Sequence, residues 1–236
     1  MSAFKELFGV ESSTIQKTCV VVPFLMAGLL KNLGIEKLQK GMLYSTAHTD
    51  SFSFIKTGIS ATLVGDAVLH LEDTCCQEIV YIGSCGLVQK TDQLNIGALV
   101  SPDKCFSFES FTDTLLQHTD KITTHYPDKP LLQTFLNNNL CINIQTVCGM
   151  SVGSLKCEEY YKNYFIEKDI QVIDMECSAV FSAAHRIKKK AVALLYVTDI
   201  IGEKPFYKLL EHTDRNKISC TVQAVCELIK TVYGIT

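Results

Sequence analysis

Short runs rich in valine and isoleucine alternate along this chain with segments of helical period. The strand-like runs are TCVVV, SFSFI, EIVYIG, GALVS, INIQTV, QVIDM and AVALLYV. The helix-like segments are VGDAVLHLEDT, SAVFSAAHRIKKK and ISCTVQAVCELIKTVYG. Such alternation is typical of α/β proteins. Because no repeat or linker interrupts it, we predict a single α/β domain over residues 1–236, with a mixed central β-sheet flanked by helices.

One long segment does not fit either pattern. Residues 101–130, SPDKCFSFESFTDTLLQHTDKITTHYPDKP, are polar, rich in threonine and bounded by prolines. We therefore predict a long loop here, or a connection whose structure gives a weak signal in the sequence, and long loops in compact domains are often functional.

Net charge and the distribution of apolar residues argue against some classes of function. The net charge of −3 argues against a broad electrostatic grip on nucleic acid, and favours small-molecule or protein partners. The longest apolar run, residues 19–30, contains Pro23 and is too short to span a bilayer. The N-terminus lacks the basic and apolar regions of a secretory signal. These features predict a cytoplasmic protein with no membrane partner.

The chain contains eleven cysteines, but no pair has the C-x-x-C spacing and no H-E-x-x-H motif occurs. With no export signal, the expected state is reduced and mostly buried thiols. We predict no metal site.

Polar groups follow three predicted strands. Ser84 lies in an expected glycine-flanked turn after EIVYIG, Glu176 follows QVIDM, and Asp199 follows AVALLYV. Ligands of open α/β sheets bind beyond the carboxyl ends of the strands. Taken singly, each residue also has a structural explanation, as a turn, a helix cap or a dipole partner. The functional interpretation depends on all three ends meeting.

A competing motif is GMSVG, residues 149–153, which fits the G-x-S-x-G nucleophile elbow between a strand and a helix. Ser151 would then be a hydrolase nucleophile. Asp174 or Asp199, followed by His185 or His212, would complete the triad. No H-G-G oxyanion segment precedes the motif, which counts against this alternative.

The segments EIVYIGSCG, QVIDMECSAVF and ALLYVTDI, in this order, together with KGMLYST, resemble the nucleoside phosphorylase and uridine phosphorylase family, which includes the methylthioadenosine nucleosidases. The resemblance covers most of the chain from about Lys40 onward. It implies a nucleoside phosphorylase-like fold and a homo-oligomer, either a dimer or a hexamer.

The resemblance also implies site roles. Glu176 would hold the ribose hydroxyls, Met175 would pack against the sugar, and Asp199 would protonate the departing base. The segment before the Met-Glu pair would place Met150 and Ser151 beside the base. Phosphate would contact Ser84 and Lys40. Asp174 is expected to be structural.

The sequence departs from the family pattern at its phosphate site. The segment VVVPFLMAGLLKNLG has neither the G-D-P-x-x-R motif nor the glutamate that nucleosidases place there. Tyr81 stands where a phosphate arginine is common, and Lys40 replaces another arginine. A phosphate site would need Lys40, Ser84 and Lys31 or Lys56.

The expected activity is phosphorolysis of a purine nucleoside to free base and ribose 1-phosphate, as in purine salvage, with inorganic phosphate as co-substrate and no other cofactor. Hydrolysis without phosphate, or nucleoside binding without turnover, are the alternatives. Purines are favoured because the Gln and Arg pair of pyrimidine-specific relatives is missing from GMSVGSLKCEEYY.

Overall fold

The computed structural model describes residues 3–140 and 142–234, and it confirms an α/β domain with a mixed central sheet. The strands are β1 Thr18–Val22, β2 Gln39–Lys40, β3 Ser45–His48, β4 Ser53–Lys56, β5 Glu78–Leu87, β6 Leu99–Phe108, β7 Thr123–His125, β8 Ile144–Val152, β9 Val172–Asp174 and β10 Lys190–Ile200. The α-helices are α1 Ala3–Phe8, α2 Leu29–Asn32, α3 Ala61–Leu69, α4 Phe111–Leu116, α5 Lys129–Leu136, α6 Glu158–Glu167, α7 Cys177–Arg186 and α8 His212–Tyr233. Short 3-10 turns cover Ser12–Thr14, Thr119–Lys121 and Leu155–Cys157.

The strand pairings close into a ring. β5 pairs with β10 in parallel and with β9 in antiparallel orientation. β9 pairs with β8, β8 with β6, and β6 returns to β10. β1, β4, β3 and β2 extend the sheet from the other part of β5. The long strands β5 and β10 therefore belong to both the ring and the open sheet.

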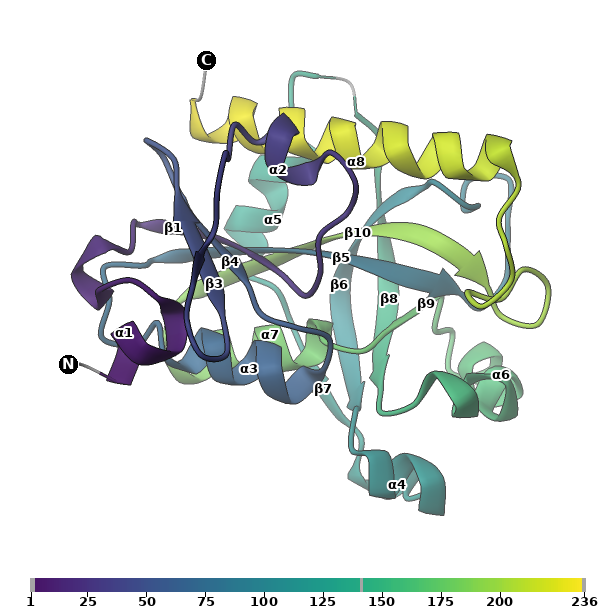
Figure 1. Cartoon of the computed structure of the whole chain (residues 1–236). Helices are drawn as coiled ribbons and strands as arrows, with labels where there is room; N and C mark the ends of the chain where they lie inside the picture. Colours follow the sequence, from purple (N-terminus) through teal and green to yellow (C-terminus); the bar gives the residue numbers. More distant parts are fainter. Residues whose placement is uncertain (1–2, 141, 235–236) are drawn as a thin grey trace.

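Helices cover both faces of this sheet (Figure 1). α8 runs along one side together with α2 and α5, and α3 and α7 lie on the opposite side. α8 ends at Gly234, whose left-handed backbone (φ 68°) suits a helix C-cap. One apolar face of α8 is buried at Ile218, Val222, Val225 and Ile229, and Val232 on the same face is partly buried.

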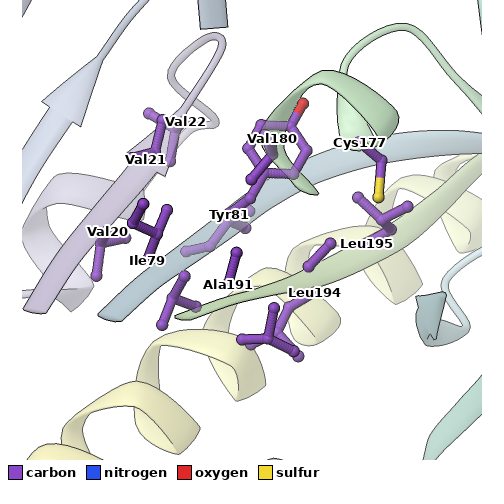
Figure 2. Packing of buried hydrophobic residues seen from close by; sticks show 14 of the residues in the cluster. Val20, Val21, Val22, Ile79, Tyr81, Cys177, Val180, Ala191, Leu194 and Leu195 are labelled. Atoms are coloured by element: carbon purple, nitrogen blue, oxygen red, sulfur yellow. The ribbon is translucent and has the colours of Figure 1, made fainter. Parts of the chain in front are cut away.

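The core lies where β1, β5 and β10 run side by side (Figure 2). Val20, Ile79 and Leu194 are fully buried there, and neighbouring strands contribute the other side chains of the same cluster. Strands buried on both faces are nearly continuous in apolar residues, which explains why these runs were recognisable in the sequence.

The long loop predicted for residues 101–130 is wrong. β6 continues to Phe108, and α4 and β7 follow within the segment. Pro102 lies at a register shift between β6 and β8, where Pro102 pairs with Val147 and Lys104 with Cys148. A proline at a bulge interrupts the alternation of apolar and polar residues, so the strand gives a weak signal in the sequence.

Over the described ranges 3–140 and 142–234, no helix is long and apolar enough to cross a membrane. Within the same ranges, no cluster of three or more His, Cys, Asp or Glu side chains is arranged to hold a metal ion.

Leu194 on β10 provides a test of this core. We expect Leu194→Ala to lower the free energy of unfolding by about 2–5 kcal/mol, because it leaves a cavity among fully buried side chains. The measurement is urea unfolding followed by circular dichroism. Leu209→Ala is the matched control: Leu209 is 91% exposed, so its truncation should change stability by less than about 0.5 kcal/mol. Equal effects of the two substitutions would contradict this assignment of the core.

Candidate active site

A cavity of about 280 Å³ lies at the ends of β5, β9 and β10. The carboxyl groups in its lining are those of Glu158, Asp174, Glu176 and Asp199. The other lining residues are Phe24, Ile59, Ser84, Cys85, Gly86, Leu155, Ile173, Met175, Thr198 and Phe206. The three polar strand ends singled out in the sequence therefore meet at one cavity.

Strand register explains why they meet. Gly86 of β5 pairs with Asp199 of β10 on one side and with Ile173 of β9 on the other. The register of β10 against β5 shifts between Val197 and Asp199, so Thr198 is an extra residue in the strand. Such a bulge redirects the side chain that follows it.

Asp199 lies directly over Gly86. A Cβ atom at residue 86 would be 2.6 Å from Asp199 Oδ2, so only glycine leaves room for this carboxyl group. Thr198 Oγ1 donates a hydrogen bond of 2.8 Å to Oδ1. Burial raises the pKa of Asp199, and the Thr198 hydrogen bond partly offsets this rise. The carboxyl group is thus held in place, and its raised pKa favours the protonated form.

Ser84 lies in the cavity wall, but the glycine-flanked turn predicted around it is wrong. β5 continues from Glu78 to Leu87 without interruption, and Ser84 pairs with Tyr196. Gly83 is required for packing instead, because a Cβ atom there would lie 2.8 Å from the Tyr81 ring.

Ser151 does not lie on the strand-to-helix turn that a nucleophile elbow requires. It lies inside β8, is 0% exposed, and its Oγ donates a hydrogen bond of 2.6 Å to Asp174 Oδ1. The same oxygen accepts from the backbone N–H of Ser178 at 2.9 Å. Neither His185 nor His212 is among its hydrogen-bond partners, and both histidines are exposed. The serine-hydrolase alternative is therefore wrong.

Met150 and Ser151 were expected beside the base, but neither is among the residues that line the cavity. Met150 is buried in a second apolar cluster, with Phe108 and Phe165. β8 therefore supports the site through the hydrogen bond of Ser151 to Asp174, and Ile173 and Leu155 are among the residues that line the cavity instead.

Asp174 has the structural role expected for it and also reaches the cavity. Its Oδ2 accepts hydrogen bonds from the backbone N–H groups of Cys177 at 2.6 Å and Glu176 at 3.1 Å. These N–H groups open α7, so Asp174 caps this helix. Burial raises the pKa of Asp174 to about 6, although its hydrogen bonds oppose the rise.

Glu176 comes from the same turn, between β9 and α7, and is 4% exposed. Tyr81 Oη donates a hydrogen bond of 3.0 Å to its Oε2, and Figure 2 shows Tyr81 rising from β5 toward α7. The other oxygen, Oε1, is buried and has no hydrogen-bond partner among the described residues. The backbone N–H groups of Met175 and Ser60 are near this carboxyl group and lower its pKa.

Burial, followed by the nearby charge of Asp174, raises the pKa of Glu176 to about 8. A buried carboxylate oxygen without a donor is unfavourable, and this orphan oxygen belongs to a residue that lines the cavity. Met175, next to it, is half-buried and also lines the cavity.

Glu158 is a site residue that the sequence reasoning missed. It is the first residue of α6, is 7% exposed and lines the cavity. Burial, followed by the charge of Asp199, raises its pKa to about 8. The only signal in the sequence was the pair of glutamates after GMSVGSLKC, which reads as an ordinary acidic helix start.

The cavity lining contains no lysine, arginine or histidine among residues 3–140 and 142–234. Lys40 is exposed on β2, and neither Lys31 nor Lys56 lines the cavity. Tyr81, at the position of a phosphate arginine, is fully buried and bonds a carboxylate. The site of this chain is thus acidic, with apolar groups such as Phe24 and Phe206 in its wall.

These groups can hold polar hydroxyls and supply protons, but they provide no positive charge for an anion. An oxygen acceptor at Glu176 suits hydroxyl donors of a ligand. An acid at Asp199 suits a leaving group that needs a proton.

A protein-family model and several solved structures match this chain. The family model described as the phosphorylase superfamily matches residues 34–230. No curated protein matches the sequence. Among solved structures, uridine phosphorylase from Vibrio fischeri has a TM-score of 0.75 at 15% identity, covering 96% of this chain and 95% of that one.

Two nucleosidases share the fold with similar TM-scores. The 5'-methylthioadenosine/S-adenosyl homocysteine nucleosidase of Campylobacter jejuni has a TM-score of 0.72 at 16% identity, covering 92% of this chain and 98% of that one. The AMP nucleosidase of Bacteroides thetaiotaomicron has a TM-score of 0.70 at 14% identity, covering 96% and 94%. Phosphorylases and nucleosidases therefore share this fold, and the fold alone does not select the reaction.

The hydrogen bonds of Ser151 lead to a prediction. Ser151→Ala should lower the free energy of unfolding by about 1–3 kcal/mol, because it removes a donor to Asp174 and leaves the Ser178 N–H unpaired. Chemical denaturation measures this loss. Ser182→Ala is the control, since Ser182 Oγ donates only to a carbonyl of its own helix, that of Ala179. Labelling of Ser151 by an active-serine fluorophosphonate probe would contradict its assignment as a support residue.

Proposed function

This chain belongs to the phosphorylase superfamily, and we propose that it cleaves the N-glycosidic bond of a purine nucleoside with water in place of phosphate. The observation that carries the proposal is the orphan oxygen of Glu176, Oε1, in the wall of an acidic cavity. A ribose hydroxyl is a donor that would satisfy this oxygen. A carboxylate beneath the sugar would also favour the positive charge that develops when the bond to the base breaks.

Asp199 is the proposed acid for the departing base. It lies in the same cavity wall, and burial favours its protonated form. The bond between the base and C1' breaks with its electron pair on the base, and a base nitrogen accepts the proton. General acid catalysis of this kind contributes about 10²- to 10⁴-fold in rate.

The charges of the cavity favour water over phosphate. A phosphate dianion would add negative charge next to Asp174, which ionises below neutral pH, and the described lining offers it no cation. Water carries no charge and meets no such barrier. It forms the new bond to C1' and releases a proton, which replaces the one that Asp199 gives to the base, so the products are free base and ribose.

Phosphorolysis, the activity expected from the sequence, is the second candidate. The observation in its favour is that Ser84 lines the same cavity as Glu176 and Asp199. It would require a cation from outside the lining. Because Lys40 is exposed on β2, a second copy of the chain in a homo-oligomer is the source that this candidate needs.

Purine nucleosides with no phosphate group are the proposed substrate class. Aromatic and aliphatic groups at the cavity wall, Phe24, Ile173 and Phe206, suit the faces of a flat base. The acidic lining disfavours nucleotides, whose phosphates would add negative charge.

The first experiment is chromatographic detection of free base from a panel of purine and pyrimidine nucleosides, with and without inorganic phosphate. We expect release of purine bases at the same rate in both conditions. Release that requires phosphate and yields a sugar 1-phosphate would establish phosphorolysis. Binding of a nucleoside without release of base would identify a binding protein.

Glu176→Gln tests the proposed ribose contact. We expect kcat/KM for a ribonucleoside to fall about 10- to 100-fold, because glutamine keeps the size of the side chain but cannot become the carboxylate that hydrogen bonds from the ribose hydroxyls favour. The matched control is a 2',3'-dideoxynucleoside, which lacks both hydroxyls and should show a much smaller difference between the two proteins. Equal losses on both substrates would place the role of Glu176 elsewhere.

A further inference from the structure

Four carboxyl groups line the cavity, and no cation of the described chain is paired with them. Glu158, Asp174, Glu176 and Asp199 are each between 4% and 7% exposed. Over residues 3–140 and 142–234, none of the four takes part in an ion pair. Buried acids without counter-ions are unfavourable unless they stay neutral or a positively charged ligand joins them.

Two of these carboxyl groups also lack hydrogen-bond partners. Glu158 lines the cavity and is 7% exposed, and its carboxyl group has no hydrogen-bond partner in the described part of the chain. Glu176 Oε1 is likewise buried without a donor. Proteins seldom bury carboxyl oxygens in this way. The unpartnered oxygens therefore indicate a ligand that brings positive charge or hydrogen-bond donors into the cavity.

The charges that act on these two groups come from other acids. Asp199 and Glu159 oppose the ionisation of Glu158, and Asp174 opposes that of Glu176. A positive charge in the cavity would offset this repulsion and favour the ionised carboxylates.

Two lysines that follow the site residues in the chain are bonded elsewhere. Lys162 lies one helical turn after Glu158 on α6, but its Nζ donates a hydrogen bond of 2.7 Å to the backbone oxygen of Ile201. Lys204 Nζ is paired with Asp214 at 2.7 Å. Neither lysine lines the cavity. The positive charge that these acids lack therefore has to come from a ligand.

Aromatic rings in the wall favour an organic cation. Phe24 and Phe206 line the same cavity as the acids. The face of an aromatic ring attracts cations, and a flat, delocalised cation can contact both rings and carboxylates. In the ranges that the structure describes, the acids are not grouped in a way that would hold a metal ion. A heteroaromatic ring with a positive charge matches both features of the wall.

We propose that the cavity binds purine nucleosides whose base carries a positive charge, such as a base alkylated on a ring nitrogen, in preference to neutral nucleosides. This inference rests on the proposed function and names the substrate class within it. A neutral base has to take up a proton from Asp199 before it can leave. An alkylated base already carries the corresponding charge when it enters the acidic cavity.

The charged base leaves without a proton donor. The bond between C1' and the ring nitrogen breaks, and its electron pair moves onto that nitrogen and neutralises the base. Water forms the new bond to C1' and releases one proton to a carboxylate or to the solvent. The products are the neutral alkylated base, ribose and a proton, so charge is conserved and no further reactant is needed.

The first test compares two ligands of the same shape that differ in charge. 7,9-Dimethyladeninium has a fixed positive charge, and 7,9-dimethyl-7-deazaadenine is its neutral counterpart with carbon in place of N7. Neither carries a sugar, so neither can be cleaved. By isothermal titration calorimetry, we expect the cation to bind at least about 10-fold more tightly, because of its attraction to the buried carboxylates. Equal affinities would overturn the inference.

Glu158→Gln tests whether the acids of the cavity cause this preference. The substitution keeps the size of the side chain and removes its charge, so the advantage of the cation should fall at least about 5-fold. Glu159→Gln is the matched control, since Glu159 is exposed and accepts a hydrogen bond of 3.3 Å from Tyr207 Oη. It should keep the wild-type advantage. Equal changes in the two variants would contradict binding in the cavity.

A measurement on the wild-type protein holds even if Glu158→Gln fails to fold. Binding of a cation favours ionised carboxyl groups, and the pKa values of Glu158, Asp174 and Glu176 are raised to between about 6 and about 8. The affinity for 7,9-dimethyladeninium should therefore increase as the pH rises through this range. The affinity for the neutral counterpart should increase less or not at all. Parallel pH dependences of the two affinities would overturn the inference.

Base release from adenosine and 7-methyladenosine separates two kinds of failure. Release of base from adenosine, in a protein that binds the cation and its neutral counterpart equally, would overturn the inference and leave the proposed function intact. Preferential binding of the cation that is reduced in Glu158→Gln, in a protein that releases no base from any nucleoside, would support the cation site and overturn the proposed function.

Discussion

The carboxyl-terminal half of β5 forms backbone pairs with β10 on one side and with β9 on the other, and the site depends on this double pairing. Gly86 lies at the point where the three strands meet. Its missing side chain leaves space for the Asp199 carboxyl, and the bulge at Thr198 directs that carboxyl toward the cavity. The closed ring therefore brings together side chains that are more than 100 residues apart in the chain.

The second constraint is electrostatic. The cavity contains carboxyl groups and, over the described residues, no cation, so burial raises the pKa of each acid in its wall. Tyr81 and Ser151 stabilise two of these acids by donating hydrogen bonds. Such a site suits a substrate that offers hydroxyl donors and carries no negative charge, and a base that takes up a proton. The same charges oppose the phosphate that the sequence resemblance led us to expect.

Much of the fold was predictable because strands buried on both faces are continuously apolar. The runs around Val20, Ile79 and Leu194 were recognised in this way, whereas the part of β6 after Ser101 was missed because Pro102 lies at a bulge. In the site, Ser84, Glu176 and Asp199 were found because polar groups stand out where they follow apolar runs. Glu158 was missed because its burial arises from the packing of α6 against the cavity, and no residue spacing reports that packing.

By itself, the sequence determined the α/β class, the strand ends that carry chemistry and the superfamily, since these follow from local residue patterns. Only the tertiary structure decided what each polar group contacts. It turned Ser151 from a possible nucleophile into a support for Asp174, and Tyr81 from a missing arginine into a donor to Glu176. It also placed Glu158 in the cavity wall with Asp199. The physical reason is that burial and hydrogen-bond partners depend on strand register and ring closure, which join residues far apart in the chain.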